Sequence, residues 1–343
     1  MLFNDGNGEL FKDSRGELPT RPYPNMSTRL YIKYSKMIFR KNVLILFFFF
    51  FCMSAWSQGT VNELVKDGVL KAKLGDYKAA MTSFDKAIAL DSMAIEPYYN
   101  RGIVRSELKD YKGAILDFSK VISRKPSYAE PYFNRAIAKD FLKDYYGAVD
   151  DYNKAINQKA DFVDAYINRG LDKFDLGDYK EAASDFSRAL QFQPTSPTAF
   201  YNRGLAEFNM NDYDNSIADF NEAIKYDTTS PEYFSSRGAA KAAAGNFEDA
   251  ILDFSVAIKL LPSDINPYMN RALAYLYLKN YQAALDDYSR VIEIDPYTVE
   301  AFLKRGVTHQ YMEDIPGACE DWRKAEELGS EKARTYMDKY CSP

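Results

Sequence analysis

Small and aromatic residues recur along this chain with a period of 34 residues. A small residue, which we number position 8 of the repeat, returns at Gly68, Gly102, Ala136, Gly170, Gly204, Gly238, Ala272 and Gly306. Positions 4, 17 and 24 are mostly aromatic in the same register, and position 20 is mostly alanine. The period divides the chain into eight repeats without an insertion: 61–94, 95–128, 129–162, 163–196, 197–230, 231–264, 265–298 and 299–332.

The pattern inside one repeat predicts two antiparallel α-helices. Glycine or a polar residue near position 15 ends the first helix, and proline at position 32 ends the second in half of the repeats. Small residues at positions 8 and 20 let the helices approach, and the aromatic rings fill the space between them. One such hairpin cannot bury its own apolar face, so the copies must stack into an all-α solenoid. Residues 331–340 are predicted to form a helix that caps the last repeat, so that 333–343, after the eighth repeat, holds the end of this helix and a tail.

This pattern resembles the tetratricopeptide repeat family over residues 61–332. It differs from that family at position 4, where tyrosine or phenylalanine replaces tryptophan, and at position 7, where arginine replaces leucine. The resemblance implies a right-handed superhelix of helix-turn-helix repeats. Its inner groove is lined by the first helix of each pair, and this groove binds a protein or peptide.

An arginine column at position 7 accompanies an aspartate column at position 23. Both positions lie at about the same height in a hairpin that turns near position 15, which predicts an ion pair within each repeat. The expected structural pairs are Arg101–Asp117, Arg135–Asp151, Arg169–Asp185, Arg203–Asp219, Arg237–Asp253, Arg271–Asp287 and Arg305–Asp321. The first repeat has Asp67 and Ser83 there, so it lacks both partners together. The alternative is that the arginines bind anionic groups of a ligand.

In the tetratricopeptide repeat family, which this pattern resembles, positions 2, 5, 6, 9, 12 and 13 line the groove. An asparagine amide both donates and accepts hydrogen bonds, so asparagine at position 6 suits an extended peptide backbone. The expected groove residues are Tyr99, Asn100, Phe133, Asn134, Asn168, Tyr201, Asn202 and Asn270. The alternative is that these asparagines bond a neighbouring helix and that the apolar residues pack between repeats.

The charge and the size of groove positions suggest two further properties. Position 2 carries Glu96, Glu130, Asp164, Glu232 and Glu300. An acidic groove favours a neutral or basic partner, although acids at a helix start also suit its dipole.

In the sixth repeat, the small residues of SSRGAAKAAAGN (235–246) predict a local recess. A drift toward a generic helix-forming sequence explains them equally well.

The segment at 37–57 has the three parts of a secretory signal peptide. Two basic residues precede an apolar run at 43–53, and small residues follow before a cut ahead of Gln58. The sequence therefore predicts export to the periplasm or cell envelope of a bacterium. If the segment is not cleaved, residues 43–56 would instead anchor the chain in the inner membrane. Residues 1–36 are polar and aperiodic, and we expect an upstream extension or a disordered tail.

Two cysteines lie near the C-terminus. Cys319 and Cys341 stand on either side of a predicted turn near residues 329–330, at similar distances from it. Antiparallel packing would bring them together, and export permits oxidation. The sequence thus predicts a Cys319–Cys341 disulfide, with two free thiols as the alternative.

Composition narrows the chemistry further. The net charge of the 343 residues is −5, which does not favour a broad nucleic-acid-binding face. A single histidine, His309, argues against histidine-based metal sites and catalytic triads, and no motif for catalysis or dinucleotide binding occurs. We expect no enzyme activity, no metal, no cofactor and no small-molecule substrate.

These observations predict a non-catalytic scaffold or adaptor of the cell envelope that binds a protein or peptide in its concave groove. The alternative is a structural subunit, or a membrane-anchored assembly factor, of an envelope complex. Such a protein would act through its convex face or its ends.

Overall fold

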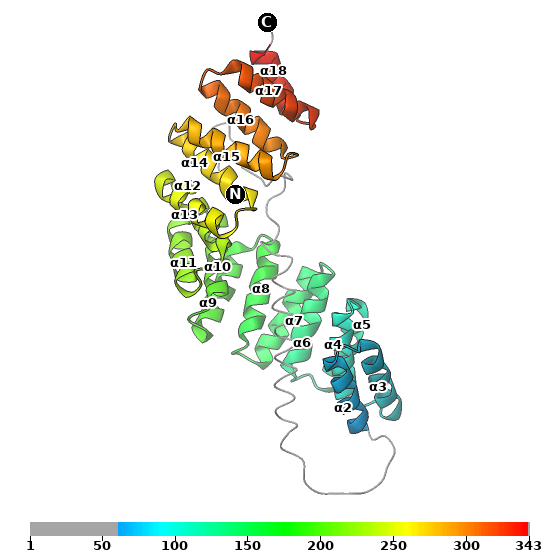
Figure 1. The fold of residues 1–343 in the computed structure, drawn as a ribbon. Helices are drawn as coiled ribbons and strands as arrows, with labels where there is room; N and C mark the ends of the chain where they lie inside the picture. Colours follow the sequence, from blue (N-terminus) through cyan, green and yellow to red (C-terminus); the bar gives the residue numbers. More distant parts are fainter. Residues whose placement is uncertain (1–60, 342–343) are drawn as a thin grey trace. The chain divides into compact units, whose positions relative to one another are not determined.

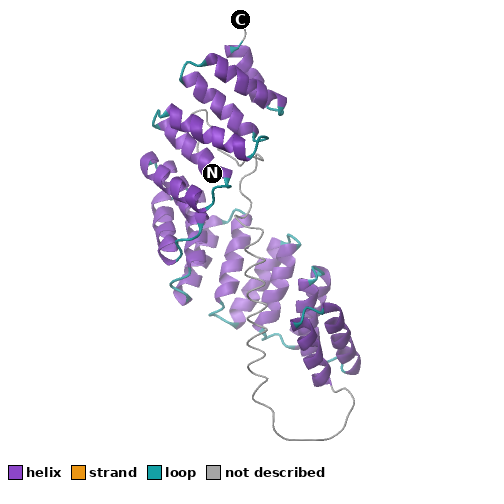
Figure 2. Ribbon diagram, in the orientation of Figure 1, coloured by secondary structure: helices purple, strands orange, loops and turns teal. Residues whose placement is uncertain are grey.

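The computed structural model describes residues 61–341, which form α-helices joined by short turns, with no strand among them (Figure 2). Each repeat contributes two helices. The first helices are α2 (Val61–Lys73), α4 (Glu96–Glu107), α6 (Ala129–Phe141), α8 (Val163–Asp175), α10 (Pro197–Asn209), α12 (Pro231–Ala243), α14 (Ile265–Tyr277) and α16 (Val299–Tyr311). The second helices are α3 (Tyr77–Leu90), α5 (Tyr111–Arg124), α7 (Tyr145–Gln158), α9 (Tyr179–Phe192), α11 (Tyr213–Tyr226), α13 (Phe247–Leu260), α15 (Tyr281–Ile294) and α17 (Ile315–Glu327).

The described residues form two units, 61–192 and 193–341, with four helix pairs in each. Within each unit the two helices of a repeat pack against each other, and each second helix also packs against the first helix of the next repeat (Figure 1). A final helix, α18 (Glu331–Tyr340), packs against α17. The fold is therefore an all-α repeat solenoid, as the 34-residue period predicts.

Residues at positions 15 and 16 set the turn inside each repeat. Position 15 takes the left-handed conformation, with glycine in three repeats and residues such as Lys109 (φ 63°) in the others. This conformation ends the first helix. At position 16, Asp110 accepts a hydrogen bond from the backbone amide of Gly113 at 2.9 Å, which caps the second helix. The repeated turn chemistry thus fixes the length of both helices.

The small residue at position 8 is required by the ring at position 24. A Cβ atom added to Gly102 would lie 2.7 Å from Cε1 of Phe118, too close for ordinary contact. The two repeats with alanine at position 8 carry tyrosine rather than phenylalanine or tryptophan at position 24, at Tyr152 and Tyr288. The Tyr288 hydroxyl is buried with no hydrogen-bond partner among residues 61–341, and nothing in the structure explains the tyrosine at this position.

The predicted signal segment at 37–57 and the preceding residues lie outside the described residues. Among residues 61–341, no helix is both long and apolar enough to cross a membrane.

Candidate protein-binding surface

The recurring arginine is held in place inside its own repeat. In the third repeat, Arg135 Nε donates to Asp151 Oδ2 at 2.8 Å and Nη2 donates to Oδ1 at 2.6 Å. The same two-point arrangement joins Arg101–Asp117, Arg169–Asp185, Arg203–Asp219, Arg237–Asp253, Arg271–Asp287 and Arg305–Asp321. Each guanidinium also lies over the ring at position 4 of its repeat, 5.3–5.8 Å from the ring centre. The aspartates are buried, so each pair is a fixed cross-link between the two helices.

The third guanidinium nitrogen reaches the preceding repeat, which the sequence interpretation missed. Arg135 Nη1 donates to Ser119 Oγ at 2.8 Å, and Ser119 stands at position 25. The equivalent bonds run from Arg101 to Asp85, from Arg169 to Asn153, from Arg237 to Asn221, from Arg271 to Ser255 and from Arg305 to Ser289. The sequence does contain a signal for these bonds, because short polar residues recur at position 25. Each of these six arginines therefore ties the two helices of its own repeat together and also ties its repeat to the preceding one.

A second cation completes the cross-link in several repeats. Position 11 supplies Lys139, whose Nζ lies 2.7 Å from Asp151 Oδ2, and Arg105, Lys173 and Lys241 lie similarly beside their own aspartates. In the last repeat His309 takes this place, with Nδ1 2.7 Å from Asp314 and Nε2 3.8 Å from Asp321. The fifth and seventh repeats carry Glu207 and Tyr275 there instead.

The first repeat reverses the chemistry of the pair. Asp67 takes the place of the arginine, and Lys71 Nζ and Ser83 Oγ both donate to its Oδ2 at 2.5 Å. The acid has moved to the first helix, and its cation follows one turn later on the same helix. The repeat thus lacks the arginine–aspartate pair but keeps a polar link between its helices.

The expected groove aromatics are not exposed to a partner. Tyr99, Phe133 and Tyr201 are only 4%, 1% and 2% exposed. The Tyr99 ring packs on Phe118 and Tyr128, with centres 6.1 and 5.4 Å away. The structure corrects the prediction for these three residues, because neighbouring aromatic rings and the adjacent repeat cover position 5.

The asparagine column divides into two groups. Asn134, Asn202 and Asn270 are buried, and Asn134 Nδ2 donates to the Tyr99 hydroxyl of the preceding repeat at 3.0 Å. The alternative interpretation, a bond to a neighbouring helix, therefore describes Asn134. Asn100 and Asn168 remain partly exposed. Their amide nitrogens donate to the carbonyls of Glu96 and Asp164 on the same helix, and no further hydrogen bond involves their side-chain oxygens within residues 61–341.

The first helices α4, α6 and α8 also carry carboxylates at their N-terminal ends. Glu96 at the start of α4 is exposed, and Glu130 and Asp164 at the starts of α6 and α8 are partly exposed. Burial raises the pKa of Asp164. Together with Asn100 and Asn168 they form the surface that we call the acidic face of α4, α6 and α8.

The expected recess in the sixth repeat is filled by its neighbours. Ala239 belongs to an apolar cluster with Phe208 of the fifth repeat, and Ala242 packs with Leu273 and Leu276 of the seventh. Both alanines are buried. Small side chains here admit larger ones from the adjacent repeats, so this expectation was wrong.

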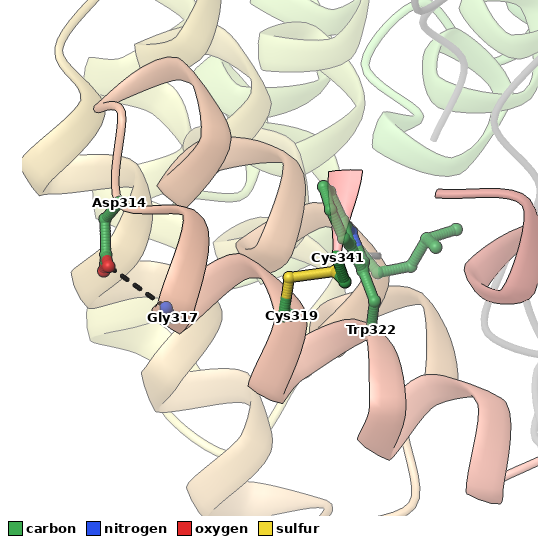
Figure 3. The surroundings of a disulfide bond; sticks show 6 residues. Asp314, Gly317, Cys319, Trp322 and Cys341 are labelled. Carbon is green, nitrogen blue, oxygen red and sulfur yellow. Dashed lines mark hydrogen bonds between the residues drawn. A yellow bond between two sulfur atoms is a disulfide. The ribbon is translucent and has the colours of Figure 1, made fainter. Parts of the chain in front are cut away.

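A disulfide joins Cys319 on α17 to Cys341 at the end of α18, with 5.8 Å between their Cα atoms (Figure 3). It lies beside Trp322, whose ring centre is 5.1 Å from that of Tyr336 and 5.7 Å from that of Tyr340. Residues 61–341 contain no group of three histidine, cysteine or acidic side chains that could hold a metal ion.

Solved structures with the same fold include two bacterial repeat proteins. The C-terminal part of a TPR repeat-containing protein from Cytophaga hutchinsonii is 20% identical, with a TM-score of 0.59 over 69% of this chain and 98% of that chain. A tetratricopeptide repeat protein from Parabacteroides merdae is 19% identical, with a TM-score of 0.54 over 74% of this chain and 97% of that one. YrrB, described as a TPR protein with an unusual peptide-binding site, is 23% identical over 52% of this chain and 92% of its own, with a TM-score of 0.47.

Sequence comparison gives the family. None of the curated proteins compared with this chain matches it. Models described as tetratricopeptide repeats match residues 95–128, 201–265 and 265–297, and a TPR repeat model matches residues 68–108 and 172–211. Together these matches cover more than half of the sequence. The chain belongs to the tetratricopeptide repeat family.

Proposed function

We propose that this protein is a non-catalytic scaffold that binds a neutral or basic segment of a protein on the acidic face of α4, α6 and α8. Tetratricopeptide repeat folds are generally non-catalytic, and proteins of this kind typically bind protein or peptide partners. The proposal relies on one observation, the separation of positive and negative charges on these three helices.

All basic residues of these helices are engaged away from the acidic face. The six are Arg101, Arg105, Arg135, Lys139, Arg169 and Lys173, and each bonds an aspartate of the following second helix. The acids at the helix starts have no such partner on the second helices. The acidic face therefore keeps its negative charge, because the basic residues of these helices are held in ion pairs elsewhere. This negative charge favours a partner of opposite charge.

Two partly exposed asparagines give this face a means of holding a backbone. The side-chain oxygens of Asn100 and Asn168 can accept hydrogen bonds from amides of an extended segment. If the asparagines bind the backbone of the partner, the preference for particular partner side chains comes from the negative charge of the acidic face. We therefore expect an extended segment with lysine or arginine rather than an apolar helix.

Synthetic unstructured peptides of equal length test this function directly. We expect a lysine-rich peptide to bind at least about tenfold more tightly than a glutamate-rich one at low salt, and to weaken as salt rises. Binding is measured by fluorescence anisotropy. The double variant Glu96→Lys/Glu130→Lys should lose the preference. The matched control Glu181→Lys/Asp214→Lys makes the same change in net charge at exposed sites on α9 and α11, outside this face, and should keep the preference. Equal binding of both peptides, or equal loss in the control, would contradict the proposal.

We also propose that the protein works outside the cytoplasm, in the periplasm or cell envelope. The predicted signal segment and the Cys319–Cys341 disulfide support this location, because disulfides persist in oxidising compartments. N-terminal sequencing of the protein from fractionated cells tests it, and a start at Gln58 is expected. Retention of residues 37–57 would instead favour an inner-membrane anchor through residues 43–56.

A further inference from the structure

The outward face of α13 carries an apolar stripe. Leu252, Val256 and Leu260 follow each other at intervals of four residues and are 64%, 37% and 41% exposed. Residues four apart lie on one side of a helix. The opposite side of α13, with Ala250, Phe254 and Ala257, is buried against α12 and α14. The stripe therefore points away from its own unit and belongs to no apolar cluster among the described residues.

The other second helices are charged at the middle of this face. Position 26, where α13 has Val256, is otherwise Lys86, Lys120, Lys154, Arg188, Glu222, Arg290 and Lys324. Seven in-register copies show that the solenoid itself does not need an apolar residue here. A valine between two exposed leucines is thus a specific departure of the sixth repeat, and exposed apolar stripes of this kind mark contact surfaces.

The two ends of the stripe carry opposite charges. Glu248 and Asp249 lie in the first turn of α13, and Lys259 lies in its last turn. At 100° per residue, all three share the side of Leu252, Val256 and Leu260. Two such helices in antiparallel orientation bring the acidic end of one beside the lysine of the other and pack the two apolar stripes together. A single patch that complements itself in this way suits a twofold contact.

We infer that the outward face of α13 is the surface through which two copies of this chain associate, with their α13 helices antiparallel. The contact is independent of the acidic face of α4, α6 and α8, which lies in the other unit. A face built on one helix is smaller than the roughly 800 Å² per partner of a standard interface, so we expect a weak, reversible dimer with a dissociation constant of about 10–100 μM.

Lysine substitution at the centre of the stripe tests this inference. Val256→Lys introduces the residue that four other repeats carry at the same position, so the fold should not change. Sedimentation equilibrium of the full chain up to about 300 μM should show a dimer for the natural protein and at least about tenfold weaker association for the variant. The control Leu116→Lys changes a leucine about as exposed as Leu252, beside the charged Lys120 of the second repeat, and it should leave association unchanged. A monomer throughout this range, or unchanged association of Val256→Lys, would overturn the inference.

A charge exchange tests the antiparallel orientation. Glu248→Lys alone should weaken association, because it places a lysine opposite the partner's Lys259. Adding Lys259→Glu to the same chain restores opposite charges across the twofold axis and should recover association. If the exchange weakens association further, the antiparallel arrangement is wrong.

Discussion

At the scale of the residue, Glu207 is the clearest exception to the cross-link chemistry. It stands where four repeats place a lysine or arginine beside the aspartate at position 23. In the fifth repeat it adds a second carboxyl group next to Asp219, and its Oε2 is buried with no hydrogen-bond partner in the described part of the chain. Arg203 Nε is 4.0 Å from Glu207 Oε1 but bonds Asp219 at 2.6 Å. Burial and the charge of Asp219 raise the pKa of Glu207 to about 8, with Asp212 adding to the effect.

This raised pKa predicts a pH-dependent stability of the repeat. Between its ordinary pKa of 4.5 and about 8, the folded chain keeps a proton on Glu207 that the unfolded chain releases. The contribution is therefore complete below pH 4.5 and is lost as the pH rises toward 8. Raising the pH from 5 to 9 should lower the free energy of unfolding of the natural protein. The corresponding decrease in Glu207→Gln should be smaller by about 2 kcal/mol. Urea denaturation at both pH values measures it, and parallel curves for the two proteins would show that Glu207 does not hold the proton.

At the scale of the element, α18 depends on few contacts and one covalent bond. It is a short helix with a single fully buried residue, Ala333. Tyr336 and Tyr340 lie against Trp322, and the disulfide fixes the end of the helix to α17. The disulfide encloses a segment with a sequence separation of 22 residues.

Loss of the disulfide should therefore loosen α18 before the rest of its unit. We expect Cys319→Ala/Cys341→Ala to lower the free energy of unfolding by about 3 kcal/mol, in line with the loop length. Amide hydrogen exchange followed by mass spectrometry should show faster exchange in residues 331–340 than in α15. The natural protein in reductant should behave like the variant, whereas unchanged protection of α18 would show that packing alone holds it.

At the scale of the whole molecule, the sequence predicted the repeats better than their exposed surface. Helix number, turn positions and the arginine–aspartate spacing follow from a period that never slips, because each of these features lies inside one repeat. The faces covered by neighbours were harder to predict. Tyr99 and Asn134 looked like groove residues, yet one bonds the other between adjacent repeats. An aromatic residue at position 5 fits a groove or an interface equally well until the packing of the next repeat is known.

The same limit explains the bonds to position 25 and the stripe on α13. Short polar residues at position 25 read as ordinary surface positions, because their arginine partner lies 16 residues further along in the next repeat. Leu252 and Val256 fit the apolar pattern of a helix, and only their exposure distinguishes them from core residues. Sequence periodicity therefore does not predict features that two repeats form together, or that one repeat forms with a partner.

The recurring arginine acts as a structural cross-link between the two helices of its repeat. Arg271 and Asp287 give the cleanest test, because Tyr275 leaves Asp287 without a second cation from position 11. In a double-mutant cycle of unfolding free energies, Arg271→Ala and Asp287→Ala should each cost about 3 kcal/mol by stranding a buried charge. The double variant should cost less than the sum by at least about 1.5 kcal/mol. Additive losses within about 0.5 kcal/mol would contradict the cross-link.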